Sequence, residues 1–180
     1  MARVARSCPG AIAFCAALAA AFSASGQSTP PVGSIAKAGD FDASVQFHVV
    51  WARDIALEKL GSPDCRRLFA EFHDLAGRPL EEVLEARDES AQQHLRRMEF
   101  LDGSRAPECG QPGVLAFTHP GSLAVFVCSA FRHMTRRKPA AAANILIHEE
   151  LHSLGAGEAP APGLLSATEI TSRVEKRCGR

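Results

Sequence analysis

The residues best suited to chemistry in this chain are His148, Glu149 and His152, which form the pattern His-Glu-x-x-His. On an α-helix, residues four apart lie above one another on the same face, so two imidazoles are presented together to a single ion. Catalytic zinc takes three protein ligands and keeps an open position for water, whose pKa it lowers to about 7. Glu149 lies beside the first histidine, where a carboxylate can act as general base on that water. The pattern therefore predicts two zinc ligands and a base.

The residues around the pattern predict one helix over positions 140–154. Pro139 favours the first helical turn, four alanines follow it, and Gly155 stops the helix just after the second histidine. An apolar stripe along this helix predicts that it is buried, and its members are Ile147, Leu151 and Leu154. The competing interpretation is that His148 is a hydrogen-bonded core histidine. Two histidines at this spacing, with a glutamate beside the first, favour the metal site.

The amino-terminal segment predicts export. Arg3 and Arg6 precede an uncharged apolar run that ends in small residues at Ala24-Ser25-Gly26, which is typical of a secretory signal peptide over residues 1–26. Residues 27–40 are rich in Ser, Pro and Gly and predict a disordered leader, so one domain is expected over residues 41–180. Removing the signal takes away two arginines and leaves a net charge of −2. This charge does not indicate nucleic-acid binding, and no later segment is apolar enough to predict a membrane span.

Four cysteines remain after the predicted signal peptide, an even number that favours two disulfides in an oxidising compartment. A hairpin turning at Pro120-Gly121 brings the residues near position 113 opposite Cys128, which favours pairing with Cys109. Cys65 then pairs with Cys178 and ties an early helix to the carboxyl-terminal one. Cysteine ligation of zinc is the competing use, but the chain has no Cys-x-x-Cys spacing.

The remaining pattern predicts a small α+β domain with a short antiparallel sheet packed on the motif helix. Residues from 41 to 60 mix an extended-looking start with a helical end, and short helices follow over 63–72, 80–86 and 90–97. Two β-rich runs, 114–118 and 123–128, flank the Pro120-Gly121 turn and predict a hairpin that leads into the motif helix. The basic run 136–138 is interpreted as a solvated loop, with binding of an anionic partner as the minor alternative.

The strand-then-helix order and the His148-Glu149-x-x-His152 pattern resemble the zincin metallopeptidases, and the chain looks like a small secreted bacterial-like protein. The resemblance covers little of the chain. In that superfamily both histidines bind Zn²⁺, the glutamate is the general base, and a third ligand follows downstream. The resemblance implies these roles for His148, His152 and Glu149. It also implies an extended substrate bound against an edge strand, a role that run 123–128 fills by analogy.

Two glutamates compete for the place of the third ligand. Glu158 stands where metzincins carry their third ligand, and Gly155 can enter the left-handed region and turn the chain back toward the two histidines. No methionine follows position 134, so the metzincin Met-turn is absent. Glu169 is the rival, because gluzincins take a glutamate from a helix downstream. Ser166 and Glu169 also form the pattern of a capping box, which would use the same carboxylate.

These observations together predict a secreted or periplasmic zinc metallopeptidase that hydrolyses peptide bonds by a zinc-activated water with Glu149 as general base. The expected partner is a peptide or protein substrate in extended conformation, with no nucleic acid, no membrane span and a monomeric state. The alternative is a noncatalytic zinc-stabilised binding module or an inactive metallopeptidase homologue. A purely structural zinc site has no need of Glu149, which favours the enzyme.

Overall fold

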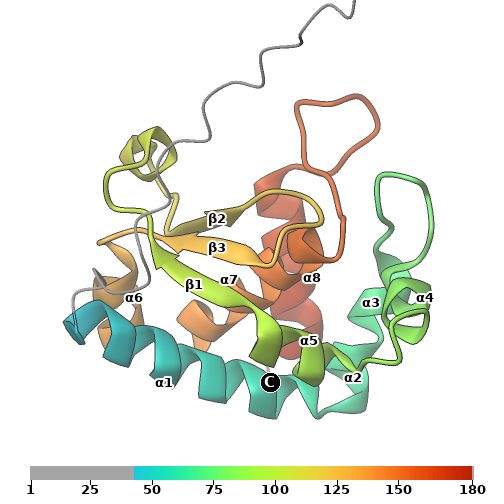
Figure 1. The fold of residues 1–180 in the computed structure, drawn as a ribbon, viewed down its shortest axis with the longest axis horizontal. Helices are drawn as coiled ribbons and strands as arrows, with labels where there is room; N and C mark the ends of the chain where they lie inside the picture. Colours follow the sequence, from blue (N-terminus) through green and yellow to red (C-terminus); the bar gives the residue numbers. More distant parts are fainter. Residues whose placement is uncertain (1–42, 180) are drawn as a thin grey trace, which may run out of the picture. The chain divides into compact units, whose positions relative to one another are not determined.

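The computed structural model describes residues 43–179, which belong to one compact unit. The predicted signal peptide (1–26) and leader (27–40) lie outside the described residues. The mixture of helices and a small sheet confirms the predicted α+β class (Figure 1). In chain order the elements are α1 (Ala43–Leu60), α2 (Pro63–Arg66), α3 (Leu68–Glu71), α4 (Leu80–Glu85), α5 (Ala91–Arg97), β1 (Glu99–Asp102), the 3₁₀ turn η1 (Pro107–Gly110), β2 (Ala116–Thr118), β3 (Ala124–Val127), α6 (Phe131–Arg137), α7 (Pro139–Ser153) and α8 (Ala167–Cys178).

The sheet has the strand order β1-β3-β2, so β3 is its central strand. Strand β2 pairs antiparallel with β3, with Phe117 opposite Phe126, which confirms the predicted hairpin. Strand β1 pairs parallel with β3 on the other side, with Phe100 opposite Val125. The expectation that run 123–128 offers a free edge is therefore wrong, because both sides of β3 are paired. The edge strands are β1 and β2.

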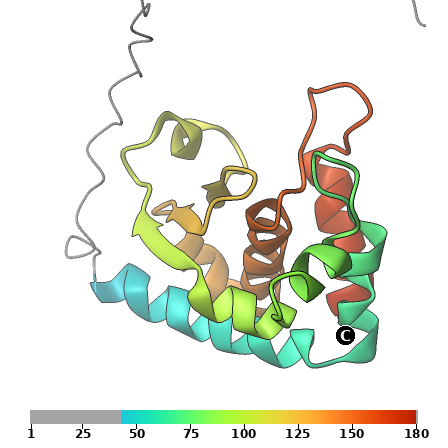
Figure 2. The same cartoon turned by 45° about the vertical axis from the view of Figure 1, so that its right-hand side comes forward.

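Helix α7 lies between the sheet and α8, as Figure 2 shows, and it also packs against α1. The predicted stripe of Ile147, Leu151 and Leu154 is buried. Other helices contribute fully buried side chains to the same core, among them Leu60 of α1 and Leu95 of α5. The motif helix is thus covered on most sides, and burial fixes its rotation about its own axis.

Two helices differ from the sequence expectations. Helix α1 is continuous, whereas an extended start was expected from its β-branched and aromatic residues. Its buried stripe has helical spacing, and this burial overrides the local β preference: Val45, Val49, Ala52, Ala56 and Leu60. Helix α6 includes Arg136 and Arg137, which were expected in a loop. Phe131 and Thr135, one turn apart, are buried and hold this short helix on the core.

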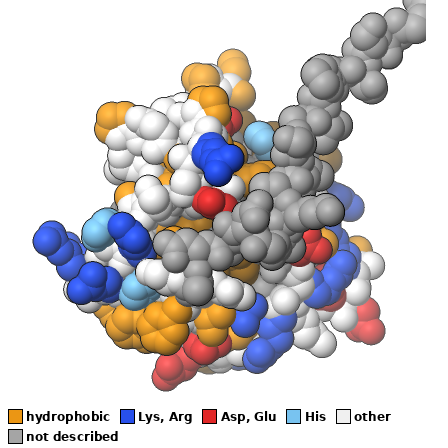
Figure 3. All heavy atoms as spheres, turned by 60° about the vertical axis from the view of Figure 1, so that its left-hand side comes forward, with side chains coloured by type: hydrophobic (Ala, Val, Ile, Leu, Met, Phe, Trp, Pro, Cys, Tyr) orange, Lys and Arg blue, Asp and Glu red, His pale blue; other side chains and the backbone are white. Residues whose placement is uncertain are grey.

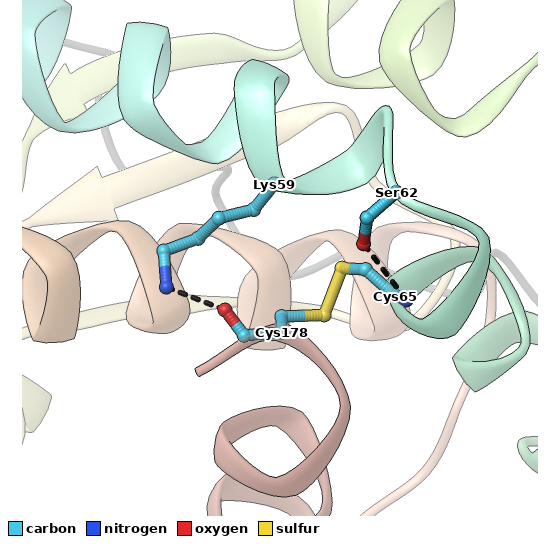
Figure 4. Close-up of a disulfide and its surroundings, with 4 residues drawn as sticks. All are labelled: Lys59, Ser62, Cys65 and Cys178. Atoms are coloured by element: carbon cyan, nitrogen blue, oxygen red, sulfur yellow. Dashed lines mark hydrogen bonds between the residues drawn. A yellow bond between two sulfur atoms is a disulfide. The ribbon is translucent and has the colours of Figure 1, made fainter. Parts of the chain in front are cut away.

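Two disulfides join the four cysteines in the pairs that the sequence favours. Cys65 and Cys178 have Cα atoms 4.6 Å apart, and Cys109 and Cys128 have Cα atoms 5.3 Å apart. Figure 4 shows the first disulfide, where Lys59 also donates a hydrogen bond to the carbonyl oxygen of Cys178. Two disulfides are consistent with an extracellular protein.

The outer side of α1 carries large apolar side chains that the core does not cover. Phe47 is 64% exposed, and Val50 and Trp51 lie beside it on the same helix face. Figure 3 shows hydrophobic side chains gathered along the lower edge of the molecule in that view, with acidic and basic side chains beside them. Within residues 43–179, no helix is both long and apolar enough to cross a membrane.

Candidate metal centre

Helix α7 presents the motif as a buried row of polar side chains inside an apolar core. His148, Glu149 and His152 are each less than a tenth exposed. The predicted helix over 140–154 agrees with the observed Pro139–Ser153 to within one residue. The two imidazole centroids are 4.9 Å apart, and their Nε2 atoms approach to 3.0 Å. The helical spacing therefore delivers two ring nitrogens to one point.

The turn after α7 brings Glu158 to the same point. Gly155 has φ of +115°, a left-handed conformation that suits glycine, and its N–H donates to the carbonyl of His152. The N–H of Ala156 donates to the carbonyl of Leu151, which completes a Schellman motif. The chain reverses there, and Glu158 Oε2 lies 3.2 Å from His152 Nε2 and 3.5 Å from His148 Nε2. The reversal expected from Gly155 is confirmed.

The second nitrogen of each ring has a partner of its own. His152 Nδ1 lies 2.8 Å from the carbonyl oxygen of Ala156, which can only accept, so Nδ1 carries the proton and Nε2 is a bare lone pair. His148 Nδ1 lies 3.0 Å from the hydroxyl oxygen of Thr171 on α8. With Nδ1 donating there too, two lone pairs and the carboxylate of Glu158 face one another. Three acceptors at such distances repel unless a proton or a cation lies among them.

The donor set fits a zinc ion. One atom from each of His148, His152 and Glu158 lies within 4.8 Å of the other two. Two imidazole nitrogens and one carboxylate oxygen are ligands that zinc accepts in catalytic sites with three protein ligands. The four cysteines of the described chain are all used in disulfides, so thiolate ligation does not compete. The same residue types also suit other divalent transition metals.

The charges of the cluster favour a cation. The contact with His148 is the largest cause that lowers the pKa of Glu158, which keeps this side chain a carboxylate. Burial is the largest cause that lowers the pKa of His152, which favours the neutral imidazole that a metal requires. An ionised carboxylate beside a neutral His152 ring suits a set of metal ligands.

Glu149 lies beside the cluster in a different environment. Burial is the largest cause that raises the pKa of its carboxyl group to about 7, and the negative charge of Glu158 acts in the same direction. The nearby His148 and a hydrogen bond from the Thr118 backbone lower it in part. One carboxyl oxygen, Oε2, is buried and has no hydrogen-bond partner in the part of the chain that the structure describes. A group with this pKa can both take and release a proton near neutral pH.

A cleft of about 380 Å³ opens over these residues. One wall is the segment from Gly113 to Thr118, which includes the edge strand β2. The other walls come from α7 and α8, and apart from the motif residues and Glu158 the lining is largely apolar, including Leu115, Phe117 and Ile145. The two histidines and Glu149 therefore line the same cleft as β2.

Glu169, the rival third ligand, is not part of this cluster. Its Oε2 accepts hydrogen bonds from the backbone N–H and the hydroxyl of Ser166, at 2.9 and 2.7 Å. This is the capping box at the start of α8. The structure therefore groups Glu158 with the histidines and uses Glu169 to begin the helix.

Two partners of the histidines were not identified from the sequence. The carbonyl of Ala156 has no side-chain signature, and only the Schellman geometry reveals it. The inward position of Thr171 could have been predicted, because Thr171 lies seven residues before Cys178 and shares a face of α8 with that buried cysteine.

A second polar contact supports the end of α7 from behind. His94 on α5 is fully buried, and its Nε2 lies 3.0 Å from the hydroxyl of Ser153, next in sequence to His152. Its Nδ1 lies 3.4 Å from a carboxylate oxygen of Glu89, which also pairs with Arg97. Ser153 is itself fully buried, so its hydroxyl and the His94 ring are closed to solvent, and their contact joins α5 to α7.

The comparisons with known proteins add no relative. No family model, no curated protein and no solved structure matches the chain. The interpretation of the cluster therefore rests on its own geometry and chemistry.

Proposed function

We propose that this protein is a secreted, zinc-dependent peptidase. One observation carries the proposal: two imidazole Nε2 atoms and the Glu158 carboxylate converge within 4.8 Å, beside the buried carboxyl group of Glu149. The two imidazoles already have partners at Nδ1, so their Nε2 atoms are arranged for an ion rather than for one another. The adjacent acid–base group distinguishes a catalytic centre from a purely structural one.

The residues that would hold zinc are His148, His152 and Glu158. Bound there, zinc would supply a Lewis acid that lowers the pKa of water and polarises a carbonyl group. The carbonyl of Ala156 holds the ring of His152 in the required tautomer. The Glu158 carboxylate offsets one of the two positive charges of the ion.

Glu149 would act as the proton carrier. Its pKa of about 7 allows the ionised form to remove a proton from water and the neutral form to give that proton to the leaving amine. Burial strengthens both steps, because water does not screen the carboxyl group from the reacting atoms. Proton transfer by a positioned side chain contributes about 10²- to 10⁴-fold to a rate.

The substrate would bind as an extended chain along β2. One side of β2 pairs with β3, and its residues from Ala116 to Thr118 line the cleft. A peptide added beside a free strand edge gains main-chain hydrogen bonds without a deep pocket. The largely apolar lining, which includes Leu115 and Phe117, suits substrates with apolar side chains near the bond to be cleaved.

The test is digestion of a peptide library by the zinc-loaded protein and by Glu149→Gln. We expect Glu149→Gln to retain zinc and to lose at least 100-fold in cleavage rate, since the amide keeps the shape and cannot accept the proton. Glu150→Gln is the matched control, because the same change is made one residue away on the same buried helix. This control should cleave at close to the wild-type rate.

Two results would overturn parts of the proposal. Absence of bound zinc in the wild-type protein would contradict the proposed zinc site. Zinc bound by both wild type and Glu149→Gln, with no cleavage by either, would replace the peptidase by a noncatalytic zinc-stabilised binding module or an inactive homologue.

A further inference from the structure

The metal centre has a support on a separate helix, at the hydroxyl group of Thr171. This oxygen lies 3.0 Å from Nδ1 of His148, the ring nitrogen on the side away from the other donors. Thr171 also lines the cleft, one turn after Ala167. Through this contact α8 touches the first histidine of the motif.

A ligand histidine needs such a partner for two reasons. A hydrogen bond from Nδ1–H leaves the proton off Nε2, and it stops the ring from rotating about its χ2 angle. For His152, the backbone carbonyl of Ala156, in the turn after α7, has both of these effects. For His148, the polar contact at Nδ1 within the described residues is the one with the hydroxyl of Thr171.

Helix α8 is itself held firmly, so the hydroxyl of Thr171 is fixed relative to α7. Ile170 and Val174 are fully buried on the inner face of α8, and the capping box of Ser166 and Glu169 fixes its first turn. At the last turn, the disulfide from Cys178 anchors the helix to α2. A partner on a rigid element orients a ligand before the ion arrives, which improves affinity.

We infer that Thr171 is a positioning residue of the metal centre, orienting His148 for zinc through its hydroxyl group. The inference rests on the proposed zinc site and adds to it the residue that sets the geometry of the first histidine. Thr171 touches neither the ion nor the substrate's reacting atoms in this role; it acts through the imidazole.

The test compares two substitutions by their affinity for Zn²⁺, measured by competition with a chelating dye. Thr171→Val keeps the shape and removes the hydroxyl, and we expect a 10- to 100-fold weaker affinity, the range known for loss of an outer partner. Thr171→Ser restores the hydroxyl and should bind within a few-fold of wild type. Ser172→Ala, an exposed hydroxyl on the same helix, is the control and should not differ from wild type.

A second measurement separates orientation from folding. In the zinc-free protein, the Nδ1 proton of His148 should give a slowly exchanging ¹⁵N-coupled NMR signal in wild type and in Thr171→Ser. In Thr171→Val this signal should be lost, while the denaturant midpoint stays near that of wild type.

The outcomes distinguish this inference from the proposed function. Equal zinc affinity in wild type and Thr171→Val would overturn the role of Thr171 and leave the peptidase untouched. Zinc binding that weakens in Thr171→Val, in a wild type that cleaves no peptide, would support the inference and overturn the peptidase. A wild type without zinc affinity would overturn both.

Discussion

At the scale of single residues, the two glutamates considered for the third ligand have different roles. Glu158 lies within 3.5 Å of both Nε2 atoms, whereas Glu169 is bonded to the backbone and hydroxyl of Ser166. Sequence spacing allowed either to reach a metal. The deciding interactions are the reversal at Gly155 and the capping box, which are both local.

Removal of each glutamate should therefore have a different result. Glu158→Ala should lose more zinc affinity than the roughly 10- to 100-fold that loss of an outer partner costs, because a ligand is removed. Glu169→Ala should keep zinc and lose a small part of the unfolding free energy, because Ser166 still caps the helix and only the bonds from Ser166 to the Glu169 carboxylate are lost. Zinc content after dialysis and urea unfolding measure the two effects. Full zinc retention by Glu158→Ala would contradict the assignment.

Glu150 is a second carboxyl group on α7 that lies outside the metal cluster. Its side chain is completely buried, neither oxygen has a hydrogen-bond partner among residues 43–179, and burial raises its pKa well above the usual range. A buried polar group without a hydrogen bond costs about 1–3 kcal/mol in proteins. The fold tolerates this cost at the centre of the motif helix.

Glu150→Met should consequently stabilise the protein. A thioether of similar length fills the same apolar space without an unbonded oxygen, and we expect a gain of about 1–3 kcal/mol in unfolding free energy. Urea denaturation of the zinc-free protein measures it. A loss of stability would show that the carboxyl group has a partner that compensates for its burial.

At the scale of elements, sequence patterns predicted what depends on local periodicity. The motif helix, the hairpin and the capped α8 all carry strong local signals: Pro139 and Gly155, the Pro120-Gly121 turn, and Ser166 with Glu169. The pairing of β1 with β3 could not be predicted, because a parallel partner comes from a distant part of the chain. Because β1 also pairs with β3, the free strand edge beside the cleft belongs to β2 and not to β3.

The contact between α5 and α7 makes stability depend on pH. Burial is the largest cause that lowers the pKa of His94 below its ordinary value of 6.5. The unfolded chain then binds more protons than the folded one near that pH, so the contribution is complete above pH 6.5 and is lost as the pH falls through it. Wild type should therefore lose more stability than His94→Gln between pH 7 and pH 5.

Urea midpoints at the two pH values, with zinc-free protein, measure this difference. Other titrating groups, Glu150 among them, are present in both proteins, so their effects cancel in the comparison when the sites are independent. Parallel changes in wild type and His94→Gln would contradict the prediction.

At the scale of the whole molecule, zinc should stabilise the fold. The three proposed ligands come from α7 and from the segment after its turn, and they are brought together only in the folded chain. Free zinc at 100 times its dissociation constant should add about 2.7 kcal/mol of unfolding free energy, and a chelator should remove it. Thermal unfolding with and without chelator measures the shift. Glu158→Ala is the control, and an equal shift in it would contradict binding at this site.

The disulfide between Cys65 and Cys178 joins residues 113 positions apart, and one of them ends the helix that carries Thr171. This placement implies an order of biogenesis. A newly made chain with free thiols lacks the covalent link that anchors α8, so we expect oxidation to precede metal loading. Refolding the reduced chain with zinc should show uptake that lags until an oxidant is added, whereas the preformed disulfide form should load at once. Chains retained in a reducing compartment would then stay poor in metal, so that the proposed peptidase would gain its metal only under oxidising conditions.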